Sequence, residues 1–314
     1  MREKPLRLRD FIEDDERRLY AVSGYDNTER VGCILRYIPD RSGSRENQEG
    51  IRYRKLEFEE AYTYIAREKP EYADLVQRVP YSDIRKVLKP EGEIENIIKR
   101  NILVKRLVTL FNLPVRTYGC TGSYLCGLES DQSDIDFVVY GRTFIHARDL
   151  LRYFVTRGEI SPISEEMWDL IFRKRNPEIS ADEFFLHEKR KWNRGQIDSV
   201  YFDILYTRPY TSLNPIPWKK GIPCGKKTIE ATVTDASLSF DNPAVYHVDH
   251  PDITKVLSFS HTYSGQALEG EVIEARGVCE NHSGKEWLIV GTTRDARGEY
   301  IKSISLIEGA DGNS

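Results

Sequence analysis

Hydrophobic and polar positions alternate differently along three stretches of the chain. Residues 1–88 contain short runs of period two, typical of strands, followed by a stretch of helical spacing. Residues 89–210 alternate helix-like runs with short apolar runs, as expected for helices packed on a sheet. Residues 211–314 contain short strand-like runs separated by turns. The pattern predicts an α+β protein with an N-terminal α+β unit, a central domain of helices on a mixed sheet, and a small C-terminal β-barrel or sandwich that is OB-like.

The predicted elements of the first two stretches are specific enough to test. In the first stretch they are strands at 18–24, 31–38 and 51–56, a hairpin loop at 25–30, a polar loop at 39–50 and a helix at 58–66. In the second they are helices at 91–113, 144–154, 164–175 and 180–192, and strands at 115–118, 134–140 and 199–206. Ser180 and Glu183 have the spacing of a capping box. The C-terminal strands are expected at 228–234, 244–247, 270–273, 287–291 and 300–306.

Two carboxylates in the predicted strand at 134–140 are the strongest chemical signal. Asp134 and Asp136 are two residues apart, so a strand directs both to the same side. Two acidic groups held this close repel each other unless a cation lies between them. A hard divalent ion such as Mg²⁺ prefers oxygen ligands and often holds phosphate oxygens as well. A glycine and a serine, Gly122 and Ser123, form a turn that ends eleven residues before Asp134. The segment therefore indicates phosphoryl or nucleotidyl transfer.

The segment from Gly122 to Tyr140, with Gly127 and the Ser133-Asp-Ile-Asp136 core, resembles the signature of the DNA polymerase beta-type nucleotidyltransferase superfamily, especially its minimal branch. The resemblance implies transfer of a nucleoside monophosphate from a nucleoside triphosphate to a hydroxyl, with two Mg²⁺ or Mn²⁺ ions held by three carboxylates. It assigns Gly122 and Ser123 to the triphosphate, and Asp134 and Asp136 to the metals.

The third carboxylate that the resemblance requires is expected at Asp203. This residue lies in an aromatic and β-branched run, Val200-Tyr-Phe-Asp-Ile-Leu-Tyr206, where an unpaired charge is unusual. Asp198, at the start of the same strand, is the alternative. In such a mechanism the third carboxylate accepts the proton of the attacking hydroxyl, or holds the ion that activates it.

Basic residues suggest two further binding surfaces, each with a structural alternative. The helix at 180–192 ends in a basic run, Lys189 to Arg194, and its members Lys189, Arg190, Lys191 and Arg194 are candidates to clamp a triphosphate or a nucleic-acid backbone. Cations at a helix C-terminus also stabilise the helix by themselves. In the N-terminal unit, basic and aromatic residues interleave, which suits phosphate contacts and base stacking but also an ordinary half-exposed sheet. These residues are Arg36, Tyr37, Arg41, Arg45, Arg52, Tyr53, Arg54 and Lys55.

Composition narrows the remaining possibilities. The chain of 314 residues has 46 Lys and Arg against 50 Asp and Glu, so a nucleic acid must be bound by local basic patches. Five cysteines form no Cys-x-x-Cys pair, and we expect neither zinc nor a disulfide framework. The cluster His247-Val-Asp249-His250 is interpreted as a surface turn rather than a metal site. The charged N-terminal residues and the lack of a long apolar run predict a cytoplasmic protein without a membrane partner.

Three functions are compatible with these observations. The first is a nucleotidyltransferase that acts on a nucleic-acid end, RNA in preference to DNA, with the flanking units holding the acceptor. The second is the same chemistry on a protein side chain or a small molecule, which the overall negative charge allows. The third is a non-catalytic protein that keeps the fold as a platform for binding nucleotide or nucleic acid, against which the intact Asp134, Asp136 and Asp203 argue.

Overall fold

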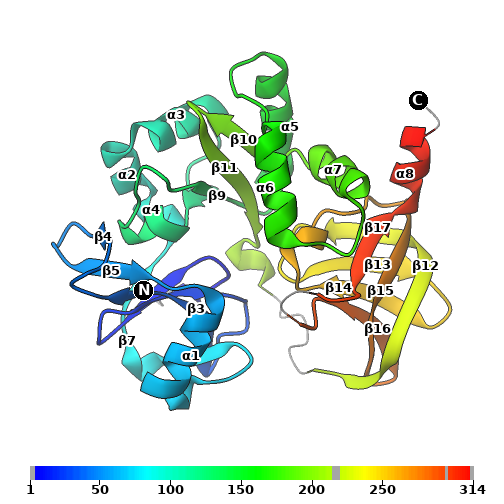
Figure 1. The fold of residues 1–314 in the computed structure, drawn as a ribbon, viewed down its shortest axis with the longest axis horizontal. Coiled ribbons are helices and arrows are strands. Elements are labelled where there is room, and N and C mark those ends of the chain that lie inside the picture. The colour runs from blue at the N-terminus through cyan, green and yellow to red at the C-terminus, as the bar shows by residue number, and fades with distance from the viewer. Residues whose placement is uncertain (1–3, 214–219, 294–295, 312–314) are drawn as a thin grey trace. The chain divides into compact units, whose positions relative to one another are not determined.

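The protein is described here by a computed structural model, which covers residues 4–213, 220–293 and 296–311 (Figure 1). Contacts between residues group the chain into two compact units. The first comprises Met1–Pro162 and Asn193–Ile216, and the second comprises Ile163–Trp192 and Pro217–Ser314. This grouping differs from the three ranges predicted above in two respects. The N-terminal strands and the strands of the middle stretch lie in one unit, whereas two helices of the middle stretch join the C-terminal strands.

The first unit begins with a sheet of seven strands. The strands are β1 (Phe11–Asp14), β2 (Leu19–Val22), β3 (Arg30–Pro39), β4 (Arg45–Glu46), β5 (Arg52–Lys55), β6 (Gln77–Pro80) and β7 (Ile84–Leu88). Their order is β4-β5-β3-β2-β1-β7, with β6 paired to β3. The predicted hairpin is the antiparallel β2–β3 pair, and the predicted helix is α1 (Phe58–Glu68), which buries Ala61 and Ile65 on the sheet.

A second sheet of the first unit has the strand order β10-β11-β9-β8. The strands are β8 (Tyr118–Cys120), β9 (Ile135–Tyr140), β10 (Arg194–Ile197) and β11 (Val200–Thr207). Only the β9–β11 pair is parallel. The helices of this part are α2 (Pro90–Arg100), α3 (Ile102–Phe111), α4 (Gly122–Cys126) and α5 (Thr143–Thr156). Apolar side chains of α3, α5, β9 and β11 form one aromatic cluster, in which Phe111 contacts Phe137, Phe154 and Phe202.

Two boundaries of this part differ from the prediction. The helix expected at 91–113 is two helices, because Asn101 leaves the helical conformation and its side chain accepts a hydrogen bond from the Val104 backbone N–H, starting α3. The strand expected at 115–118 begins at Tyr118, because Pro114 starts a turn in which its carbonyl accepts a hydrogen bond from the Thr117 N–H. Apolar residues continue at similar spacing through Asn101 and Pro114, so the sequence pattern did not reveal either boundary.

Helix α4, which lies between β8 and β9 in the chain, packs on the N-terminal sheet. Leu125 and Leu128, at and just after α4, pack with buried residues of the N-terminal sheet. The guanidinium of Arg7 lies 3.8 Å from the ring centres of both Tyr140 and Tyr210 and pairs with Glu91 at 2.9 Å. These contacts attach the N-terminal segment to the second sheet, so the two parts form one structural unit.

The second unit consists of three helices and one sheet. The helices are α6 (Glu165–Arg175), α7 (Ala181–Arg190) and α8 (Ile304–Asp311). The strands are β12 (Ile222–Leu238), β13 (Ala244–Asp249), β14 (Ile253–Ser258), β15 (Val272–His282), β16 (Lys285–Val290) and β17 (Tyr300–Ser303). The order is β12-β13-β14-β16-β15-β17, and an additional β12–β15 pairing closes a ring of five strands. The curved strands around this ring are visible in Figure 1.

Most elements of the second unit follow the predicted positions. The capping box at Ser180 and Glu183 is formed. Strand β14 was not predicted, because its short apolar run carries no clear period. The strand predicted at 300–306 is wrong beyond Ser303, because the Ser303 hydroxyl accepts a hydrogen bond from the Leu306 N–H at 3.1 Å and helix α8 begins at Ile304. The ring of His250 accepts hydrogen bonds from the backbone N–H groups of Asp252 and Ile253, which gives it a role in the turn before β14. Among the described residues, no helix combines the length and apolar character needed to cross a membrane.

Candidate active site

Strand pairing brings two of the predicted carboxylates side by side. Strand β9 runs parallel to β11, and Asp136 lies opposite Asp203 in the register. Neighbouring strands are about 4.8 Å apart, and paired residues point to the same face. Asp134, directly before β9, shares this face by alternation and is exposed to solvent. Asp198, the alternative third carboxylate, lies in the β10–β11 turn, where it pairs with Arg106. The register therefore favours Asp203.

Gly122 lies against the carboxylate of Asp136. Its φ angle is 65°, in the left-handed region that favours glycine. A Cβ atom at this position would lie 2.5 Å from Oδ2 of Asp136, closer than real contacts allow. The backbone N–H of Thr121 donates to the Asp136 carbonyl at 3.0 Å, which fixes the start of α4 beside β9. The glycine of the signature is thus required twice, by its backbone conformation and by its contact with Asp136.

Two serines of the signature have different surroundings. Ser133 is buried, and its hydroxyl accepts hydrogen bonds from the Ser130 N–H at 2.9 Å and from Arg45 Nη1 at 3.2 Å. It closes the turn that leads into Asp134. The hydroxyl of Ser123, at the start of α4, makes no hydrogen bond within the described part of the chain. Ser133 therefore supports the loop, whereas the Ser123 hydroxyl has no such structural partner among the described residues.

The carboxylates form an electrostatically unfavourable group by themselves. The pKa of Asp136 is raised to about 6, chiefly by burial and also by the negative charges of Asp203 and Asp134, although the positive charges of Arg9 and Lys55 oppose this rise. The oxygen atoms of the three carboxylates do not all lie within 4.8 Å of one another. Carboxylate oxygens are the donors that Mg²⁺ and Mn²⁺ prefer. A divalent cation would relieve the repulsion, so these residues fit the metal chemistry that the signature implies.

Arg194 is beside the third carboxylate. It lies opposite Asp203 in the antiparallel β10–β11 pair, and its Nε donates to Asp203 Oδ1 at 2.8 Å. The side chain of Arg194 is almost fully buried. The sequence suggested Arg194 as part of a triphosphate clamp. In the structure its contact with Asp203 orients that carboxylate and supplies a positive charge next to it.

The other three residues of the suggested clamp belong to the second unit. Lys189 is exposed at the end of α7. Arg190 pairs with Glu271 and donates to the Gln266 carbonyl at 2.7 Å. Lys191 is buried, pairs with Glu188 and donates to the Thr262 carbonyl at 3.1 Å. The prediction that Lys191 clamps a triphosphate is therefore corrected, because its ammonium group is enclosed by its own unit.

Two basic residues of the N-terminal unit lie near these carboxylates. Arg9 was not predicted as a site residue, and Lys55 was predicted only as part of the basic and aromatic surface. Arg9 has a φ angle of 76°, and its Nε donates to the Tyr206 carbonyl at 3.3 Å. Its own carbonyl accepts from the Thr121 hydroxyl at 2.6 Å, next to Gly122. Arg9 and Lys55 both lower the pKa of Asp136. No sequence motif marks Arg9, because its approach depends on packing between two sheets.

Several of the interleaved basic and aromatic residues are buried or paired within the protein, and so do not form an exposed binding surface. Tyr37 and Tyr53 are buried, so their rings are not available to stack on bases. Arg45 Nη1 donates to the Leu128 carbonyl at 2.6 Å, besides its contact with Ser133. Arg54 pairs with Asp40 at 3.2 Å and also with Glu60. Base stacking by the two tyrosines, as considered from the sequence, is therefore corrected.

The arrangement of Gly122 against Asp136, with Asp203 opposite on a parallel strand, defines a nucleotidyltransferase-type site. A family model described as a nucleotidyltransferase domain matches residues 100–193. The chain is also 33% identical over 339 aligned positions to an uncharacterised protein of Methanocaldococcus jannaschii, with 95% of this chain and 98% of that protein covered. No solved structure matched the chain. The chain belongs to the polymerase beta-type nucleotidyltransferase superfamily, as its signature predicts.

Proposed function

We propose that this protein is a metal-dependent enzyme that transfers a nucleoside monophosphate from a nucleoside triphosphate to an acceptor hydroxyl, and that the acceptor is an RNA end. The observation that carries the transfer chemistry is the register of Asp136 with Asp203, together with the contact of Gly122 with Asp136. This combination places acidic oxygens beside a glycine that admits a ligand close to the backbone.

Each residue has a separate task in this proposal. Asp134, Asp136 and Asp203 hold two Mg²⁺ or Mn²⁺ ions, which when bound would stabilise negative charge on the attacking and leaving oxygens. Gly122 and the hydroxyl of Ser123 bind the triphosphate at the start of α4. Arg194 orients Asp203 through its 2.8 Å hydrogen bond. Arg9, from the N-terminal segment, places a positive charge near Asp136.

The strand order of the C-terminal ring supports nucleic acid as the acceptor. If β12 to β16 are counted as strands one to five, the order around the ring is 1-2-3-5-4. The fourth strand pairs with the first and closes the ring, and the third and fifth strands are parallel. This strand order supports the OB-like fold that we propose for the C-terminal domain, and such folds commonly bind oligonucleotides. We therefore assign the C-terminal domain to acceptor binding, and prefer RNA to DNA as in the sequence analysis.

The proposal is tested by incubating the protein with Mg²⁺ or Mn²⁺ and each ribonucleoside triphosphate labelled at the α-phosphate. Total RNA, a DNA primer and the protein alone serve as acceptors. We expect label on RNA. Label on the protein itself, or on added small hydroxyl compounds, would replace the RNA proposal by the second class of acceptor. Absence of transfer together with nucleotide binding would favour the non-catalytic platform.

A pair of matched variants tests the site. In this proposal the charge of Asp136 helps to hold the ions that stabilise the transition state by several kcal/mol. Asp136→Asn should therefore lower turnover by at least about 10³-fold. Without added metal its thermal stability should not fall, because the substitution removes a charge that Asp134 and Asp203 repel. Asp131→Asn, an exposed position of the same loop, is the control and should retain turnover. Equal turnover in both variants would reject the assigned role of Asp136.

A further inference from the structure

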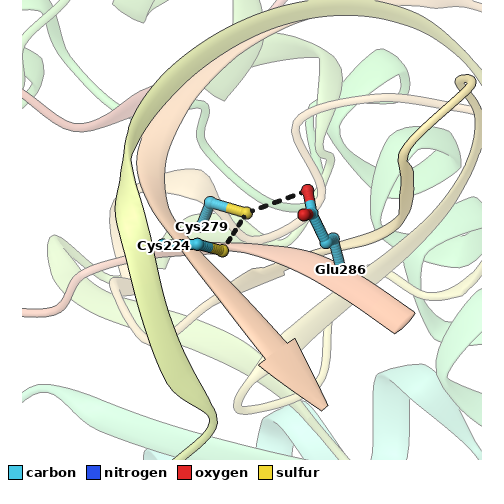
Figure 2. Close-up of side chains that lie close together, drawn as sticks. All are labelled: Cys224, Cys279 and Glu286. Atoms are coloured by element: carbon cyan, nitrogen blue, oxygen red, sulfur yellow. Dashed lines mark hydrogen bonds between the residues drawn. The ribbon is translucent and has the colours of Figure 1, made fainter. Parts of the chain in front are cut away.

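Two cysteines and a glutamate meet on the sheet of the second unit, outside the site described above. Figure 2 shows Cys224, Cys279 and Glu286 directed toward one another. The two Sγ atoms are 2.8 Å apart, and Cys279 Sγ is 3.3 Å from Glu286 Oε2. All three donor atoms lie within 4.8 Å of one another, and this is the one group of that kind among the described residues. The cysteines are 55 positions apart in sequence.

The sheet builds this cluster from three strands. The pairing of β12 with β15 shifts between Pro223 and Lys226, so Cys224 lies in an irregular segment opposite Cys279. The next residue, Gly225, has a φ angle of 103°, which such an irregularity commonly requires. Cys279 pairs with Leu288 of β16, and Glu286 is two residues earlier on the same face. Diagonal neighbours of this kind are within reach of each other across a sheet.

Hydrogen bonding alone gives this group little stability. Thiols are weak donors and weak acceptors, so the contacts of Cys279 with Cys224 and Glu286 are poor substitutes for water. An ion that replaces the thiol protons would remove this mismatch between burial and weak bonding.

We propose that Cys224, Cys279 and Glu286 bind one Zn²⁺ ion, with the fourth position open to water or a ligand. Cysteine thiolates and glutamate carboxylates are both zinc ligands, and zinc in open sites is four-coordinate with three ligands from the protein. Binding replaces two S–H bonds by two Zn–S bonds and releases two protons. The ion and its ligands then carry a net charge of about −1, which Lys227 offsets through its 2.7 Å contact with Glu286 Oε2.

Only a small rearrangement completes this geometry. Zn–S bonds of about 2.3 Å at tetrahedral angles separate the sulfur atoms by about 3.8 Å, and a sulfur from a ligand oxygen by about 3.5 Å. The contact of 3.3 Å between Cys279 and Glu286 already fits. Cys224 would move outward by about 1 Å, which its exposed position in the irregular segment permits.

A disulfide is the competing outcome for the two cysteines. It would draw the sulfur atoms to about 2.05 Å and would need a two-electron oxidant such as another disulfide. Glu286 would then contribute nothing to the bond, although it faces both sulfur atoms. The third donor therefore favours the metal. A bound ion would fasten the exposed start of β12 to β15 and β16.

The test uses the full chain, reduced and stripped of metal, to which Co²⁺ and then Zn²⁺ are added in excess Mg²⁺. Co²⁺ reports on its ligands, because thiolate ligation gives a charge-transfer band and a tetrahedral site gives intense visible bands. We expect one equivalent of Co²⁺ to produce these bands and Zn²⁺ to abolish them. We also expect Cys224, the exposed thiol of the pair, to become protected from a thiol reagent. Excess Mg²⁺ keeps the carboxylates of the first unit from interfering.

Variants then assign the ligands. Cys224→Ser and Glu286→Gln should each weaken Zn²⁺ binding by more than about 100-fold, beyond the 10- to 100-fold typical for loss of a supporting residue. Lys227→Met should weaken it by about tenfold. Cys126→Ser removes a thiol of the first unit and should leave the spectrum unchanged. The proposal is overturned if the charge-transfer band is missing or persists in Cys224→Ser, or if the two thiols are isolated as a disulfide that no metal prevents.

Discussion

Replacing Gly122 by alanine should disable the proposed site while leaving the rest of the fold in place. The new methyl group would begin 2.5 Å from Asp136 Oδ2, whereas ordinary contacts of a Cβ atom start at 3.4 Å. The carboxylate must therefore retreat by about 1 Å. A misplacement of this size at a reacting centre costs about 10²-fold in rate, so we expect turnover to fall by at least that factor.

The same substitution also strains the backbone. An alanine in the left-handed region costs roughly 1–2 kcal/mol relative to glycine, which lowers the free energy of unfolding by about that amount. Gly158 offers the matched control, because its φ angle is 73° and nothing lies within 4 Å of a Cβ added there. Gly158→Ala should therefore lose similar stability and keep its turnover.

Two assays separate these effects. Urea denaturation followed by circular dichroism measures the stability of both variants. Nucleotidyl transfer, supported by Mn²⁺ binding in the presence of nucleotide, measures the site and does not depend on knowing the acceptor. If Gly122→Ala bound Mn²⁺ and turned over like Gly158→Ala, the contact between Gly122 and Asp136 would have no functional importance and our reasoning would be refuted.

Two further predictions concern stability. Arg7→Met should lower the free energy of unfolding, measured by urea denaturation, by about 3–5 kcal/mol, because it leaves the buried carboxylate of Glu91 without its principal partner. Lys4→Met, which removes the exposed partner of Glu91, is the control and should change the free energy of unfolding little. Burial lowers the pKa of His187 to about 4, and its neutral ring accepts from the Ser303 N–H at 2.8 Å, so the unfolded chain binds the proton first as pH falls. Stability should be complete above about pH 6.5 and decline by about 3 kcal/mol toward pH 4, a decline that His187→Gln should reduce and an unchanged pH profile would contradict.

The signature segment from Gly122 to Tyr140 could be predicted because its residues are close in sequence. Gly122, Ser133 and Asp136 lie within one turn–helix–strand segment, where spacing and alternation determine which side chains share a face. The capping box at Ser180 was predicted for the same reason, since its two partners are three residues apart. Local geometry limits such residues to few arrangements.

Element boundaries were less predictable where one local signal opposed another. The apolar period continues from α2 into α3, and only the side-chain cap by Asn101 separates them. Strand β14 escaped the sequence analysis because six residues carry too little period, and its place depends on a parallel partner, β16, that is distant in the chain. Such pairings are decided by the packing of the whole sheet.

The sequence by itself determined the superfamily, the two carboxylates before and within β9, the glycine beside them and the order of most helices and strands. Only the tertiary structure decided that Asp203 and not Asp198 lies opposite Asp136, that Lys191 is enclosed by its own unit, and that Cys224 meets Cys279. The physical reason is that these contacts join segments separated by many residues. Their approach depends on strand register and on the burial of apolar faces, which no local spacing records.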